Sequence, residues 1–164
     1  MNNVPTVAVI IVAAGRGQRA GGDVPKQWHH IAGKLVLQHT LDVFASHSRI
    51  TEIVLVIADA DQNLIETLTL PKNASIAVGG AERSTSVLSR LNATQADNVL
   101  IHDAARCCVS PEVIDRVLDA LQTAQAAAPA LPVTDALWTG TDNHVTGVQD
   151  RSGLYRAQTP QGFK

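Results

Sequence analysis

Val9-Ile10-Ile11-Val12-Ala13-Ala14-Gly15-Arg16-Gly17-Gln18-Arg19 is the stretch that decides the fold. Its four consecutive β-branched residues predict a strand, from residue 6 to 12, that is buried on both faces. A loop rich in glycine and cations follows directly and continues to Lys26. Glycine lets backbone N–H groups approach a ligand closely, and cations complement phosphate oxygens. The stretch therefore predicts a triphosphate site at the end of the first strand.

Two other interpretations of this loop stay open. The spacing from Gly15 to Ala20 also satisfies the dinucleotide fingerprint G-x-G-x-x-A, which would indicate NAD. That fingerprint needs a helix to begin at once, and Gly21, Gly22 and Pro25 oppose one. The loop could also be a solvated surface loop without a ligand. A P-loop is excluded, because no G-x-x-x-x-G-K-[ST] occurs in the chain.

Length and composition indicate one ordered domain over residues 1–164. Apolar residues make up 45% and charged residues 17% of the chain, which suits a packed core. The net charge of −2 predicts no nucleic-acid partner. No apolar run is long enough for a signal peptide or a membrane span, so we expect no membrane partner and a cytoplasmic location.

The two cysteines, Cys107 and Cys108, are adjacent in the sequence. They cannot form a disulfide framework and lack the spacing of a zinc site. We expect two small thiols, buried or half-buried, in a reducing compartment.

The pattern of strands and helices alternates, which predicts an α/β fold with a mainly parallel, doubly wound sheet. The expected strands cover residues 6–12, 53–58, 75–78, 98–102 and 128–133, and the expected helices cover 36–44, 61–68, 83–94 and 110–125. Turn residues at 140–143 predict a β-hairpin over 138–149. Ligands bind such sheets at the carboxyl ends of the strands, where the Gly15 loop, Gly79-Gly80 and Asp103 all fall.

Five segments in this order resemble the 2-C-methyl-D-erythritol 4-phosphate cytidylyltransferase family, and the resemblance runs from the first strand to the last residue. They are Ala13 to Arg19 with Pro25-Lys26-Gln27; Gly79 to Val87; His102-Asp103-Ala104-Ala105-Arg106; Pro132-Val133-Thr134-Asp135; and Asp150 to Gln161. The resemblance implies a Rossmann-like nucleotidyltransferase with a protruding β-hairpin arm over 136–151. The family continues beyond the point that corresponds to Lys164, so we expect the domain to be incomplete at its C-terminus.

The resemblance implies transfer of CMP from CTP to 2-C-methyl-D-erythritol 4-phosphate, with release of pyrophosphate and with Mg²⁺ as cofactor. The attacking phosphate oxygen is already an anion, so the reaction needs charge stabilisation more than a base. By resemblance, Arg19 and Lys26 are catalytic. Ala13, Ala14, Gly15, Gly17, Gly80, Ala81, Ser86 and Ala104 bind the nucleotide. Asp103, Arg106, Asp135 and Arg151 bind the substrates, and Asp103 also holds the metal.

The resemblance further implies a homodimer, in which the arm reaches across to a second subunit. Two positions depart from the family pattern, with Ala136 in place of a common threonine and Cys107 in place of a common proline. The alternatives are a ribitol-5-phosphate cytidylyltransferase, which shares the nucleotide loop, and a nucleotide-binding or dimerisation fragment without activity. The six histidines show no paired-ligand pattern, so we assign them no metal.

Overall fold

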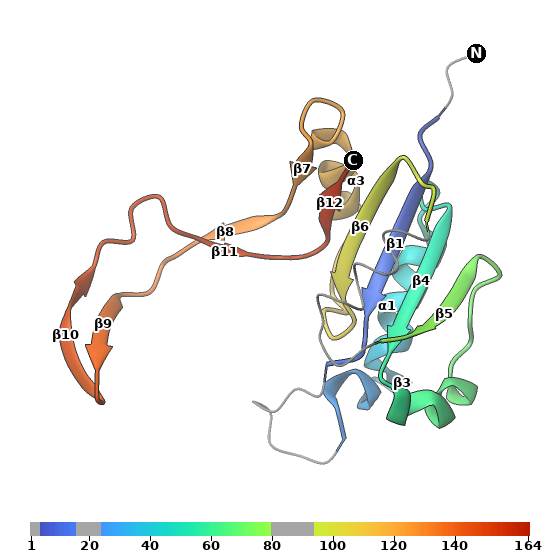
Figure 1. Ribbon diagram of the computed structural model, residues 1–164, viewed down its shortest axis with the longest axis horizontal. Coiled ribbons are helices and arrows are strands. Elements are labelled where there is room, and N and C mark those ends of the chain that lie inside the picture. The colour runs from blue at the N-terminus through green and yellow to red at the C-terminus, as the bar shows by residue number, and fades with distance from the viewer. Residues whose placement is uncertain (1–3, 16–23, 80–93) are drawn as a thin grey trace.

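The computed structural model describes residues 4–15, 24–79 and 94–164 of the chain (Figure 1). A six-stranded sheet with the order β5-β4-β1-β6-β12-β7 forms its centre. Four neighbouring strands are parallel, namely β5 (Ala74–Val78), β4 (Glu52–Ile57), β1 (Val7–Val12) and β6 (Asn98–Asp103). The strands β12 (Gln161–Phe163) and β7 (Ala126–Ala127) add an antiparallel edge. The predicted mainly parallel α/β sheet is confirmed.

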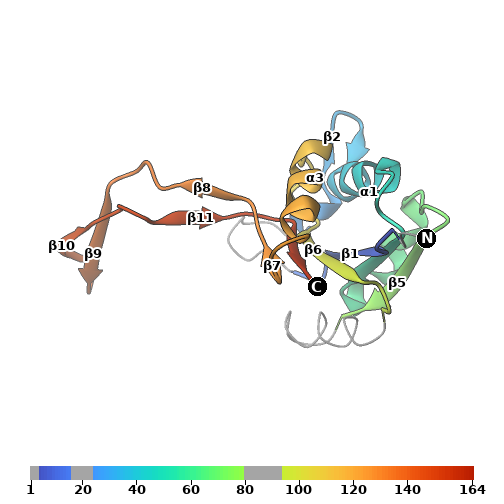
Figure 2. The same ribbon diagram turned by 90° about the horizontal axis from the view of Figure 1, so that it is seen from above.

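Both faces of the central strand β1 are buried, as its run of β-branched residues predicts. Val9 and Ile11 belong to the larger core cluster, which also contains residues of the helices α1 (Val36–Ser46) and α3 (Pro111–Ala120). Ile10 points to the opposite face and joins a smaller cluster with Val54, Val56, Ala77 and Val99. Figure 2 shows α1 and α3 on the same side of the sheet. Alternation along the strand thus divides one apolar run between two cores.

The helix α1 confirms the prediction over 36–44 and buries Leu37, Leu41 and Phe44 along one side. The helix α3 begins at Pro111, within one residue of the predicted start at 110, and the side chain of the preceding Ser110 makes no capping hydrogen bond. It ends at Ala120, so the predicted end at 125 is wrong. The chain tightens there into i→i−3 hydrogen bonds, such as that from Gln122 N–H to the Asp119 carbonyl oxygen.

Two other predicted elements differ from the structure. The helix predicted over 61–68 is a 3₁₀ helix, η3 (Asp59–Thr67), which begins two residues earlier and is closed by i→i−3 bonds. The strand predicted over 128–133 is shorter in the structure, because only β8 (Ala130–Pro132) falls within that range, and a break separates it from β7. Pro129 lies at the break, where it has no N–H to donate to a strand ladder. The helix predicted over 83–94 lies almost wholly outside the described residues.

A long two-stranded arm leaves the core after β7 and returns to it at β12 (Figure 1). Its strands are β8, β9 (Leu137–Thr141), β10 (His144–Gln149) and β11 (Tyr155–Ala157), paired as β8 with β11 and β9 with β10. The tip turns at Asp142 and Asn143, which have φ values of 50° and 62°. Two successive residues with positive φ are typical of the hairpin turn that suits strand twist. The predicted hairpin over 138–149 is confirmed, and we call residues 130–157 the arm.

Several short elements give no periodic signal in the sequence, because each has only two or three residues. They are η2 (Lys26–Trp28), β2 (His30–Ile31), β3 (Lys34–Leu35), β7, β11 and β12. β12 packs closely on α3, since a Cβ on Gly162 would lie 2.8 Å from Val117 Cγ1 and 2.9 Å from Leu121 Cδ1. Among the described residues, no helix has the length and apolar character needed to cross a bilayer.

Candidate functional site

The candidate site lies where β1 and β6 end side by side. Val12 pairs with Asp103, and the Ala104 N–H donates to the Val12 carbonyl oxygen at 3.1 Å. The Ala13 N–H donates to Val56 on the other neighbour, β4, at 2.7 Å. The chain passes from β1 outward through β4 and β5, then returns to β6 on the opposite side of β1. This reversal creates the crevice in which open α/β sheets bind ligands.

Gln27 fixes the backbone at the start of the glycine loop. Its side chain is 5% exposed, and Nε2 donates to the carbonyl oxygens of Ala13 at 2.6 Å and Gly15 at 3.2 Å. A buried amide that donates two hydrogen bonds holds this backbone in one arrangement. Gly15, which is exposed, is therefore set at the crevice by a residue from the other side of the loop.

Lys26 is exposed on the one-turn helix η2, immediately before Gln27. The helix is anchored by its next residue as well, because the buried Trp28 donates from Nε1 to Oδ2 of the buried Asp61 at 3.0 Å. Two buried neighbours thus hold the backbone of Lys26, while its ammonium group stays in solvent. An exposed cation on an anchored backbone suits the binding of a phosphate group.

At the end of β6, Asp103 and Arg106 form an ion pair. Arg106 Nε lies 3.0 Å from Asp103 Oδ2, and both side chains are partly exposed. Arg106 Nη1 also donates to Gln158 Oε1, which comes from the chain returning from the arm. The guanidinium is therefore positioned at the crevice by two partners that are 55 residues apart in the sequence.

His102 is fully buried beneath this pair and connects three backbone segments. Its Nε2 lies 3.1 Å from the Arg106 carbonyl oxygen, and its Nδ1 lies 3.0 Å from Thr159 Oγ1. Burial lowers the pKa of His102 to about 4, so the ring is neutral at pH 7. The carbonyl can only accept, so Nε2 carries the proton and Nδ1 accepts from the Thr159 hydroxyl. Thr159 Oγ1 in turn lies 3.4 Å from the Asp103 N–H, which donates to it.

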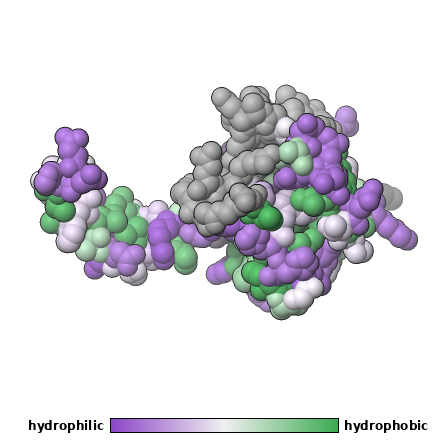
Figure 3. Space-filling view, turned by 90° about the horizontal axis from the view of Figure 1, so that it is seen from below, coloured by the Kyte–Doolittle hydropathy of each residue, from purple (hydrophilic) through white to green (hydrophobic). Residues whose placement is uncertain are grey.

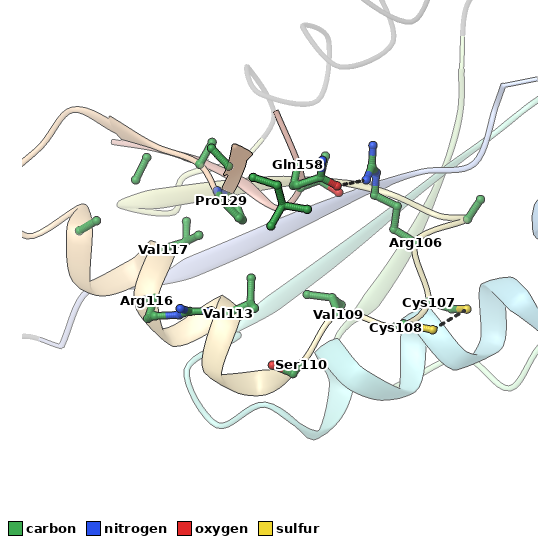
Figure 4. A pocket seen from close by; sticks show the side chains of 17 residues that line it. Arg106, Cys107, Cys108, Val109, Ser110, Val113, Arg116, Val117, Pro129 and Gln158 are labelled. Carbon is green, nitrogen blue, oxygen red and sulfur yellow. Dashed lines mark hydrogen bonds between the residues drawn. The ribbon is translucent and has the colours of Figure 1, made fainter. Parts of the chain in front are cut away.

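A pocket of about 740 Å³ adjoins this cluster, between the β6–α3 connection, α3 and the base of the arm. Figure 4 shows Arg106 and Gln158 at one side of it and Val109, Val113 and Val117 along its apolar wall. The sequence gives no sign of this pocket, because segments far apart in the chain line it.

The structure brings together six of the residues predicted for the site: Ala13, Ala14, Gly15, Asp103, Ala104 and Arg106. Lys26 directly precedes Gln27, whose side chain is hydrogen-bonded to Ala13 and Gly15. The structure does not bring Asp135 and Arg151 to this crevice, because both belong to the arm, where Arg151 Nη1 donates to the Thr134 carbonyl oxygen. Gly17, Arg19, Gly80, Ala81 and Ser86 lie outside the described residues. The expectation of buried or half-buried thiols holds for Cys107 and is wrong for Cys108, which is exposed in the turn after β6.

The metal prediction rests on Asp103 alone among the described residues. Within residues 4–15, 24–79 and 94–164, no three His, Cys, Asp or Glu side chains are grouped to hold a metal ion. Mg²⁺ is commonly bound by one or two carboxylates together with substrate phosphates. The partly exposed carboxylate of Asp103, at the crevice where the sequence predicts a phosphate site, fits that mode of binding.

Sequence reasoning missed Gln27, His102 and Thr159 as parts of the site. The sequence offered one indication, because Gln27 directly follows Lys26 and His102 directly precedes Asp103, and Lys26 and Asp103 were both predicted site residues. The hydrogen bond between Thr159 and His102 could not be predicted, because these two residues meet only in the folded chain.

Comparison with known proteins identifies the family to which this chain is similar. The family model of IspD, 2-C-methyl-D-erythritol 4-phosphate cytidylyltransferase, matches residues 7–164. A protein of that name from Roseobacter denitrificans is 53% identical over 161 residues, which cover 96% of this chain and 72% of the relative. A bifunctional IspD/IspF enzyme from Ruegeria sp. is 54% identical over 96% of this chain and 42% of its own length. The chain thus spans less than half of the bifunctional relative.

A solved structure with the same family name is similar to this chain. The crystal structure of 2-C-methyl-D-erythritol 4-phosphate cytidylyltransferase from Thermus thermophilus superposes with a TM-score of 0.76 at 34% identity. The superposition covers 96% of this chain and 70% of that structure.

Proposed function

The chain belongs to the 2-C-methyl-D-erythritol 4-phosphate cytidylyltransferase family, and on that premise we propose that it transfers CMP from CTP to 2-C-methyl-D-erythritol 4-phosphate and releases pyrophosphate. The observation that carries the proposal is the crevice between β1 and β6. There Gly15 and an aspartate–arginine pair lie at adjoining strand ends, and an exposed lysine, Lys26, directly precedes the glutamine that anchors Gly15.

The chemistry joins two anions, so the chain's main task is to offset their repulsion. The substrate phosphate attacks the α-phosphorus of CTP, and negative charge grows on the oxygens passed to pyrophosphate. Lys26 supplies a point charge near those oxygens, and Arg106 supplies a fork of donors for the sugar phosphate. Arg19, by resemblance, adds a second cation to the nucleotide loop. Because the attacking group is already an anion, this mechanism assigns no general base.

The backbone around Gly15 receives the nucleotide phosphates. Gln27 holds the Ala13 and Gly15 carbonyl oxygens and so fixes the backbone at the start of this loop. Gly17, Gly80, Ala81 and Ser86 complete the nucleotide contacts by resemblance. Asp103 would hold a divalent cation such as Mg²⁺, which, when bound, neutralises phosphate charge and orients the reacting groups.

A homodimer formed through the arm is part of the proposal. Six of the twelve large hydrophobic residues that are exposed among the described residues belong to the arm: Leu131, Trp138, Val145, Val148, Leu154 and Tyr155. Trp138 and Val148 are cross-strand partners and are 67% and 79% exposed. Figure 3 shows apolar side chains along the arm, beyond the body of the molecule. A thin ribbon has no core of its own, so such side chains favour burial against a second copy. Asp135 and Arg151 then serve the partner's crevice.

Turnover with two sugar phosphates tests the proposed substrate. Initial rates are measured with CTP and Mg²⁺ and either 2-C-methyl-D-erythritol 4-phosphate or ribitol 5-phosphate. We expect a clear preference for the branched substrate, and preference for ribitol 5-phosphate would overturn the assignment. CTP binding without pyrophosphate release would favour a binding fragment.

A cytoplasmic location is also proposed, since the exposed thiol of Cys108 suits a reducing compartment.

A further inference from the structure

Cys107 and Cys108 form a pair of thiols beside the candidate site, and the proposed reaction does not use them. Their Sγ atoms lie 3.9 Å apart and face each other (Figure 4). Cys108 is exposed, Cys107 is half-buried, and both line the pocket that adjoins Arg106. A small solute can therefore reach the first sulfur while the second lies next to it.

The turn that carries this pair is held on both sides. On its N-terminal side, the Arg106 N–H donates to the Asp103 carbonyl oxygen at 2.9 Å, and the Arg106 carbonyl accepts from the buried His102. On its C-terminal side, the Ser110 carbonyl accepts from Val113 N–H at 3.1 Å at the start of α3. These hydrogen bonds hold the backbone of the turn on which the two sulfur atoms lie next to each other.

We infer that Cys107 and Cys108 are a reversible oxidation site, at which hydrogen peroxide converts the two thiols into an intrachain disulfide. In the first step the Cys108 thiolate attacks the peroxide O–O bond, and a sulfenic acid and hydroxide form. That hydroxide becomes water with the proton that Cys108 gave up. In the second step the Cys107 sulfur attacks the Cys108 sulfur, the S–O bond breaks, and the departing hydroxide leaves as water with the Cys107 proton. Two thiols and one peroxide give one disulfide and two waters.

The order of the steps follows from exposure, since thiolate character and access decide which cysteine meets the oxidant. Burial and the neighbouring Cys108 raise the pKa of the Cys107 thiol, so it stays protonated until the first sulfur is oxidised. Adjacent Cα atoms lie about 3.8 Å apart, short of the roughly 4.4–6.8 Å usual for disulfides. The resulting ring is strained and exposed, and such disulfides are the easily reduced ones.

Intact mass and thiol counting of the full chain test this inference, because the chain has only two cysteines. The protein is treated with a small excess of hydrogen peroxide at low protein concentration and is then denatured and titrated for thiols. We expect the mass to fall by about 2 Da, both thiols to disappear together, and dithiothreitol to restore both.

Cys107→Ser and Cys108→Ser are the matched controls, since neither can lose 2 Da within one chain. Persistence of both thiols in the wild type would overturn the inference. So would their loss only as disulfide-linked dimers, or as mass gains of about 32 Da per cysteine, which mark irreversible sulfinic acid. None of these readouts depends on the proposed enzymatic function.

Discussion

The Nε2 atom of His102 lies 3.1 Å from the carbonyl oxygen of Arg106, and the ring that makes this contact is completely buried. The neutral ring therefore positions an arginine of the candidate site through its backbone. Burial lowers the pKa of His102 from 6.5 to about 4. Between these two pH values the unfolded chain binds a proton that the folded chain does not, so stability falls as the pH falls.

We predict that this histidine makes the free energy of unfolding about 2 kcal/mol lower at pH 5 than at pH 7. Urea unfolding of the wild type and of His102→Gln at both pH values measures the effect. The two proteins have the same carboxylates, so the difference between their pH dependences reports on His102. The variant should lose that part of the pH dependence, whereas His30→Gln, at an exposed position, should keep it. Equal pH dependence in all three proteins would contradict a buried neutral His102.

Gln27 is expected to stabilise the loop after β1. Gln27→Leu removes the donor for the Ala13 and Gly15 carbonyls, of which the first bond is buried. An unsatisfied buried acceptor costs about 1–3 kcal/mol, so unfolding should become easier by that amount in urea. Gln62→Leu is the control at an exposed position and should change stability by no more than about 0.5 kcal/mol. The same small change in both variants would refute the proposed anchor.

Lys26 is expected to act in the transition state. Lys26→Ala should lower the turnover number by about 100-fold or more, because it removes a charge aimed at the departing pyrophosphate. Its circular dichroism and melting temperature should stay close to those of the wild type, since the side chain is exposed. Lys34→Ala removes an exposed lysine paired with Asp42 and should keep normal turnover. Near-normal turnover of Lys26→Ala would remove Lys26 from the mechanism.

The arm is expected to hold the dimer together. Trp138→Ser combined with Val148→Ser removes an exposed apolar cross-strand pair and should raise the dimer dissociation constant at least about 10-fold. Sedimentation velocity over a concentration series measures this constant. Ile31→Ser changes an exposed apolar residue outside the arm and should leave it unchanged. A wild type that is monomeric at micromolar concentration would count against the arm as the interface.

The parts of the site that could be predicted lie within single stretches of sequence. The β-branched run before Gly15 indicates a buried strand, and Asp103 follows another apolar strand, so both fall at carboxyl strand ends. Parallel pairing then brings them together, and the register of Val12 with Asp103 confirms it.

The remaining parts depend on contacts that no local pattern contains. Thr159 reaches His102 only after the chain has travelled out along the arm and back, and Gln158 reaches Arg106 in the same way. The strand β12 is too short to show periodicity, and its place beside β6 follows from close packing of Gly162 on α3. The roles of Asp135 and Arg151 come from the family resemblance alone and stay predictions.

Pyrophosphate release by this chain is the most direct test of the central claim. The assay contains CTP, Mg²⁺ and 2-C-methyl-D-erythritol 4-phosphate, and each is omitted in turn. The account predicts release that requires all three, with formation of the cytidylyl product in equal amount. Absence of release with all three present, or release that continues without the sugar phosphate, would contradict it.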